Sequence, residues 1–144
     1  MALLKAISSG QIADPASGTP LKTSRIEMVA NLDILGSTLS PVLKYYKEYM
    51  IILGGSRWEG RFEKLNVPYQ LHLTYDYYGS RDFTNLFYRK TGDHKPFLDA
   101  GIHCLVFTSG ITMRTNKPTD DAPSLNYPVL EKRTGLISDF LLNL

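Results

Sequence analysis

The chain has 144 residues, a length typical of one domain that can bury its own hydrophobic core. Its 16 basic and 14 acidic residues leave a net charge of +2, which is too small to predict a nucleic-acid partner. The hydrophobic fraction of 43% is ordinary for a globular protein, and no stretch approaches the roughly 20 apolar residues of a membrane span. We therefore expect neither nucleic acid nor a membrane as a partner.

The single cysteine and the first residues restrict the cellular location only weakly. Cys104 lies in the apolar run of residues 101–107, so we expect a buried side chain and no internal disulfide. Residues 1–9 are too short for a signal peptide and lack its charged first region. Either the protein is intracellular or its leader peptide is not included in this sequence, so its cellular location stays open.

The first 24 residues are predicted to lie outside the main domain. Residues 2–8 can form two turns of helix with apolar side chains on one face. Residues 10–24 are rich in glycine, proline, serine and threonine, as is typical of a linker. We therefore expect a short helix and linker over residues 1–24 and a folded domain over residues 25–144.

The folded domain alternates between predicted strands and predicted helices. Strands are predicted where apolar residues cluster or alternate, within residues 25–35, 49–53, 71–75 and 102–108, the third of them at a sheet edge. Helices are predicted where a capping residue or proline precedes apolar residues at helical spacing, over residues 41–46, 57–65, 80–87, 96–100 and 128–141. This alternation predicts an α/β fold with a mostly parallel sheet flanked by helices. Four strands are few for this class, so we expect them to be part of a larger sheet.

Acidic and imidazole side chains are predicted close to the ends of two strands. They stand after the first strand and on both sides of the last one: Asp33, Asp93, His94, Asp120 and Asp121. Ligands of α/β proteins bind beyond the carboxyl ends of strands, and carboxylate with imidazole suits zinc, manganese or non-haem iron. The sequence contains no HExxH, no CxxC and no histidine pair four residues apart, so the pattern alone indicates a metal weakly. Asp33 also suits a turn or a helix cap.

Two interpretations of Asp93 and His94 stay open. In the first, His94 donates a hydrogen bond to a substrate carbonyl or to a tetrahedral oxyanion. In the second, Asp93 caps the helix that Pro96 begins, and His94 is exposed. The other histidines, His72 and His103, lie at predicted strands and are expected to be structural.

Nucleophilic catalysis and phosphate binding receive little support. Ser109 lacks the G-x-S-x-G context of a nucleophile elbow, so we set acyl-enzyme chemistry aside. The turn at residues 54–56 follows a strand, but it has neither a dinucleotide fingerprint nor a P-loop lysine.

Three groups of residues resemble motifs of the M28 family of zinc aminopeptidases. Residues 31–36, NLDILG, are similar to the family's N-[FLI]-D-M-[IL]-G strand end, where the aspartate binds zinc. Residues 92–102, GDHKPFLDAGI, are similar to S-D-H-x-P-F-x-x-A-G-I. Residues 107–110, 116–120 and 125–127 are similar to F-x-S-G, H-x-P-x-D and L-D-Y. The resemblance covers most of the predicted domain and implies a truncated M28-like zinc exopeptidase fold without its amino-terminal segments.

The resemblance also implies metal ligands that this chain mostly lacks. The family's two-zinc site uses an H-x-D segment and a Glu–Glu pair, and this sequence contains neither. Asn116 stands where the family's last histidine ligand is expected, and an amide oxygen is a poor zinc ligand beside imidazole. Of the implied ligands only Asp33 remains. We therefore expect that zinc, the family's cofactor, is not stably bound here.

This incomplete ligand set decides the expected function. One carboxylate cannot hold two zinc ions, and without a general base nothing activates the attacking water. We expect an M28 metallopeptidase-like protein without independent peptidase activity that binds a peptide or serves in assembly, with Asp93 and His94 as substrate-binding residues.

Two alternatives stay open beside this expectation. One is an active zinc-dependent aminopeptidase with an altered site, completed across a dimer, that uses Asp33, Asp93, His94 and Asp120. The other is a structural subunit that completes another chain's sheet. Since proteins avoid uncovered sheet edges, we expect a homodimer or a partner chain that covers the edge.

Overall fold

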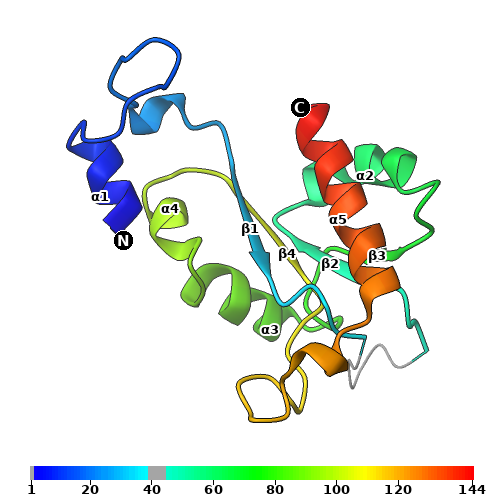
Figure 1. Ribbon diagram of the computed structural model, residues 1–144. Helices are drawn as coiled ribbons and strands as arrows, with labels where there is room; N and C mark the ends of the chain where they lie inside the picture. Colours follow the sequence, from blue (N-terminus) through cyan, green and yellow to red (C-terminus); the bar gives the residue numbers. More distant parts are fainter. Residues whose placement is uncertain (1, 39–44) are drawn as a thin grey trace.

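The computed structural model describes residues 2–38 and 45–144 and has an α/β architecture (Figure 1). Its strands are β1 (Val29–Asp33), β2 (Tyr49–Leu53), β3 (His72–Thr74) and β4 (Cys104–Thr108). Its helices are α1 (Ala2–Ser8), α2 (Glu59–Leu65), α3 (Arg81–Asn85), α4 (Lys95–Asp99) and α5 (Tyr127–Leu142). Single turns of other helix types cover Thr23–Arg25, Ser56–Trp58, Leu86–Lys90 and Ala122–Ser124. The predicted α/β class is confirmed, while the helix predicted over residues 41–46 falls mostly outside the described residues.

Within the described residues, the strands form one four-stranded sheet in the order β1-β4-β2-β3. β1 pairs in parallel with β4, and β2 pairs in parallel with β3. β4 and β2 are antiparallel, so the sheet is mixed rather than fully parallel. The carboxyl ends of β1 and β4 therefore meet at one end of the sheet, and those of β2 and β3 meet at the other. β3 lies at an edge, as its alternating sequence predicts.

The two central strands are buried throughout, and helices cover both faces of the sheet. β2 and β4 are continuous apolar runs, which is the pattern of strands with two covered faces. One face packs against α2 and α5 through a core of Met50, Ile52, Phe62, Leu71, Leu105, Phe107, Val129, Leu136, Ile137 and Phe140. The opposite face packs against the chain around α3 through Tyr49, Ile51, Leu53, Tyr77 and Val106 (Figure 1). None of the described helices combines the length and apolar character needed to span a lipid bilayer.

The segment before β1 has local structure of its own. α1 buries Ile7, and a short antiparallel bridge joins Ala13 to Pro20 in the part predicted as a linker. The Leu21 N–H closes this loop by donating to the Ile12 carbonyl at 2.7 Å.

α5 begins one residue before the predicted Pro128 and buries most of the predicted apolar stripe, with one polar exception. The Asn126 side chain caps its first turn by accepting a hydrogen bond from the Val129 N–H at 3.2 Å. The predicted apolar stripe is buried at Val129, Leu136, Ile137 and Phe140, whereas Leu141 is exposed. The exception is Arg133, a charged residue that lies fully buried within this stripe.

The Arg133 guanidinium ties α5 to two other parts of the chain. Its Nε donates to the Tyr49 carbonyl at 2.7 Å, and its Nη1 donates to the carbonyls of Leu35 and Ser37, the latter at 2.8 Å. The guanidinium carbon also lies 5.1 Å from the centre of the Tyr49 ring. Burial lowers the pKa of Arg133 to about 10, so the group stays charged at neutral pH. One side chain therefore joins α5, the start of β2 and the turn after β1.

We expect Arg133→Met to destabilise the fold by about 3 kcal/mol, because hydrogen bonds to a charged donor contribute roughly 1.5–3 kcal/mol each and their acceptors become unpaired. Urea unfolding measures the change. The matched control is Lys132→Met, which removes a partly exposed ion pair with Glu48 and should cost at most about 1 kcal/mol. Equal stability of the Arg133→Met protein and the wild type would contradict this expectation.

Candidate functional site

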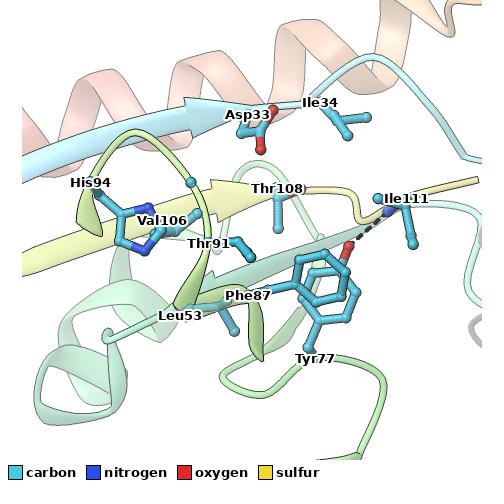
Figure 2. Close-up of a pocket in the computed structure, with 11 residues that line it drawn as sticks. Asp33, Ile34, Leu53, Tyr77, Phe87, Thr91, His94, Val106, Thr108 and Ile111 are labelled. Carbon is cyan, nitrogen blue, oxygen red and sulfur yellow. Dashed lines mark hydrogen bonds between the residues drawn. The ribbon is translucent and has the colours of Figure 1, made fainter. Parts of the chain in front are cut away.

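A cavity of about 150 Å³ lies at the carboxyl ends of β1 and β4. Asp33 and Thr108 border it at the ends of the two strands, and the chain between Tyr77 and His94 forms the opposite wall (Figure 2). Its lining combines a carboxylate, hydroxyl groups, an imidazole and apolar side chains, contributed by Asp33, Ile34, Leu53, Tyr77, Phe87, Thr91, His94, Val106, Thr108 and Ile111.

Asp33 is the acidic residue of this cavity, and the alternation of β1 places it there. Met28 and Ala30 pack on the α5 side of the sheet, so Asn31 and Asp33 point to the opposite side. In the parallel ladder Asp33 lies opposite Thr108. The Asp33 carboxylate is exposed and has no hydrogen-bond or ion-pair partner among the described residues. It is thus available to a ligand, and the prediction that Asp33 ends a strand is confirmed.

The turn after Asp33 is held by Ser109. Ile34 has a φ of 56°, in the left-handed region that a β-branched residue seldom adopts. Its carbonyl accepts two hydrogen bonds from Ser109, one from the backbone N–H at 2.8 Å and one from Oγ at 2.6 Å. The Ser109 hydroxyl is therefore engaged by the backbone.

Two aromatic rings form the wall opposite Asp33. Tyr77 and Phe87 stack with ring centroids 4.2 Å apart and an angle of 18° between their planes (Figure 2). The buried Tyr77 hydroxyl accepts a hydrogen bond from the Ile111 N–H at 2.7 Å. Burial raises the pKa of Tyr77, and the negative charge of Asp33 raises it further. Tyr77 is therefore a neutral phenol at physiological pH and cannot act there as a base.

His94 is buried, and protein groups occupy both of its ring nitrogens. It is 2% exposed, and its ring stacks on that of Tyr88 with centroids 5.7 Å apart. Nε2 lies 2.8 Å from the Tyr88 carbonyl, which can only accept, so Nε2 carries the proton. Nδ1 then accepts from the Asn31 amide at 3.4 Å. The N–H that we expected to reach a substrate is thus donated to Tyr88.

The interpretation in which Asp93 caps the helix and His94 is exposed is wrong. α4 has His94 itself at its N-cap position, and no side chain caps the helix. Asp93 is exposed and does not line the cavity. The imidazole turns inward because Asn31 and the Tyr88 carbonyl offer hydrogen bonds there, which a buried ring requires.

The second predicted acidic loop lies apart from this cavity. Asp120 lines a separate hollow of about 210 Å³, which Asp33 does not line. The Asp120 carboxylate accepts a hydrogen bond from the N–H of Asn116, which has a φ of 60°. Asp121 starts the turn at Ala122–Ser124 through its carbonyl, without a side-chain cap. Of the predicted acidic and imidazole residues, the structure brings only Asp33 and His94 to a common cavity.

The residues of the cavity do not fit a zinc ion. Zinc in proteins is held by three or four nitrogen, sulfur or carboxylate ligands. Among the residues that the structure describes, no three His, Cys, Asp or Glu side chains are close enough to hold a metal together. At the cavity itself, Asp33 offers a free carboxylate, while both nitrogens of His94 already have partners. Asn116 does not line this cavity, so it supplies no metal ligand here.

The remaining singled-out residues have structural roles. His103 donates from Nε2 to the Gly54 carbonyl at 3.1 Å, and burial lowers its pKa, with Arg57 adding to the effect. His72 stacks on the ring of Tyr46 at 3.7 Å. Cys104 is buried as predicted, and burial raises the pKa of its thiol to about 11. None of these groups reaches the cavity.

The aromatic wall could not be predicted directly from the sequence. Tyr77 and Phe87 belong to a tyrosine- and phenylalanine-rich stretch, which indicates half-buried surfaces but not which rings meet. The contribution of Thr108 follows only from its pairing with Asp33 across two strands far apart in sequence.

Comparisons with known proteins leave the family open. No family model matches the chain, and no curated protein matches it either. The resemblance to M28 peptidases therefore depends on the three groups of motif residues alone.

We expect His94→Ala to destabilise the fold by about 1–3 kcal/mol, because the Tyr88 carbonyl loses its buried donor. His94→Gln should recover part of this loss, since its amide nitrogen can replace Nε2. Urea unfolding of both variants measures the difference. If His94→Ala is as stable as the wild type, the imidazole has no structural role.

Proposed function

We propose that this chain is a peptidase-like α/β domain, resembling the M28 family, that binds a ligand without hydrolysing it. The observation that carries the proposal is that the Asp33 carboxylate is free, whereas both ring nitrogens of His94 already have hydrogen-bond partners. Of the described residues, Asp33 alone brings a carboxylate to the cavity. The cavity therefore offers a ligand one fixed negative charge.

Hydrolysis needs more than this cavity supplies. A peptide carbonyl must be polarised, and a water molecule must lose a proton to a base within hydrogen-bond reach. Tyr77 is neutral and already bonded to the Ile111 N–H, and the N–H of His94 is donated to Tyr88. Asp33 by itself can accept a proton, but among the described residues the lining contains no lysine or arginine to stabilise a developing oxyanion.

The same geometry suits a small cation. Asp33 attracts a positive charge, and aromatic faces such as those of Tyr77 and Phe87 stabilise a cation that lies within about 6 Å of the ring. A cavity of about 150 Å³ has room for a group as large as benzene. The amino-terminal residue of a peptide, with its ammonium group and a small side chain, meets these conditions. We therefore assign a peptide amino group as the preferred ligand.

Added zinc should neither stabilise the protein nor make it a peptidase. We expect stoichiometric zinc to shift the melting temperature by less than about 1 °C, since a ligand stabilises only a state that binds it. Hydrolysis of an alanyl-arylamide should stay at the rate of the buffer, with and without zinc. A rise of several degrees that disappears in Asp33→Ala would overturn the proposal in favour of a metallopeptidase.

Alaninamide should bind at the cavity, and N-acetylalaninamide, which lacks the ammonium group, should not. Backbone NMR shifts of Thr91 and Thr108 follow the titration. Asp33→Asn keeps the shape of the side chain and removes its charge, so we expect an affinity about fivefold lower, equivalent to about 1 kcal/mol. Equal binding of the two amides to the wild type would show that charge does not select the ligand.

A further inference from the structure

A row of side chains on one helical face leads from the cavity to the surface. Phe83, Phe87 and Thr91 follow one another at intervals of four residues, along Arg81–Asn85 and Leu86–Lys90, and therefore share one face. Phe87 and Thr91 line the cavity. The Phe83 and Phe87 rings stack with centroids 6.3 Å apart and an angle of 28° between their planes. Phe83 therefore extends the aromatic wall by one helical turn beyond the cavity.

Apolar side chains at the rim of the cavity are accessible to solvent. Phe83 is 49% exposed, and Ile111, which lines the cavity, is 41% exposed. The Ile111 N–H donates to the Tyr77 hydroxyl at 2.7 Å, which holds Ile111 beside the stacked rings of Tyr77 and Phe87 (Figure 2). The rim on the aromatic side of the cavity is therefore apolar and open to a ligand.

We propose that Phe83 and Ile111 form a second subsite, which binds the second residue of a peptide and selects a large apolar side chain. This inference rests on the proposed function, in which the amino-terminal residue occupies the cavity with its ammonium group at Asp33. Successive Cα atoms of a peptide are about 3.8 Å apart, so the second residue leaves the cavity over its rim. A large apolar side chain there covers Phe83 and Ile111 and removes their surface from water.

The charge of the cavity opposes an acidic group at the same place. In the part of the chain that the structure describes, the lining contains Asp33 but no lysine or arginine that could pair with a carboxylate of the ligand. The α-carboxylate of a free amino acid, or an acidic second side chain, would lie within about 8 Å of Asp33 and be repelled by it. The ligand class is therefore a peptide amino terminus with a small first residue and a large apolar second residue.

Titration with dipeptide amides, followed by the backbone NMR shifts of Thr91 and Thr108, tests this selection. We expect alanyl-phenylalaninamide to bind about tenfold more tightly than alanyl-glycinamide, because its phenyl ring is buried at the second subsite. The α-amide of alanyl-glutamate should bind no more tightly than alanyl-glycinamide. N-acetylalanyl-phenylalaninamide keeps the phenyl ring but lacks the ammonium group, so it should bind about tenfold more weakly than its unacetylated form.

Two substitutions of Phe83 test its role. Phe83→Ala should reduce the preference for phenylalanine over glycine to about twofold or less. Phe83→Arg should bind the glutamate amide about threefold more tightly than alanyl-glycinamide, a gain that a misfolded protein cannot show. The matched control is Val67→Ala, since Val67 is 71% exposed and does not line the cavity. This control should keep the tenfold preference for phenylalanine.

The outcomes separate this inference from the proposed function. Equal binding of alanyl-phenylalaninamide and alanyl-glycinamide to the wild type, or an unchanged preference in Phe83→Ala, would overturn the second subsite alone. If the acetylated dipeptide binds as tightly as the free one, the phenyl ring binds independently of the cavity and the inference is also wrong. If none of the amides binds, the proposed function fails and this inference fails with it.

Discussion

The buried guanidinium of Arg133 is the constraint on which the candidate site depends. Three carbonyls from the turn after β1 and from β2 converge on this one side chain of α5. Apolar packing holds α5 against the sheet but has no direction, whereas a guanidinium fixes its acceptors through a rigid set of donors. By holding Leu35 and Ser37, Arg133 fixes the path of the chain directly after Asp33. The position of the Asp33 carboxylate thus depends on a charge buried on the other side of the sheet.

Most polar side chains around the cavity stabilise the fold and are not available to a ligand. His94 donates a hydrogen bond to the Tyr88 carbonyl, and Ser109 donates two to the Ile34 carbonyl. The Tyr77 hydroxyl accepts one from the Ile111 N–H. A buried polar group without a partner is costly, so a chain that turns these groups inward must satisfy them internally. What remains at the surface of the cavity is the Asp33 carboxylate beside two aromatic rings. This division explains why a cavity lined by many polar residues offers a ligand only the negative charge of Asp33.

The sequence predicted those parts of the fold that depend on residues close to one another along the chain. The buried strands, the α5 stripe and the position of Asp33 at a strand end all follow from periodicity and from turn residues. The antiparallel pairing of β4 with β2 could not be predicted, because strand order depends on contacts between distant segments. The burial of His94 depends in the same way on Asn31, which lies 63 residues earlier. Arg133 interrupts an apolar stripe, and the sequence does not show that the carbonyls of Leu35, Ser37 and Tyr49 lie within hydrogen-bond distance of its guanidinium.

The mixed sheet also explains why so few functional groups meet. In a fully parallel sheet the carboxyl ends of all strands lie at one end, so their loops share a crevice. Here β1 and β4 run towards one end of the sheet and β2 and β3 run towards the other, although Leu53 at the end of β2 also lines the cavity. The cavity therefore draws its acidic group from β1 alone, and its other wall comes from the chain between β3 and α4.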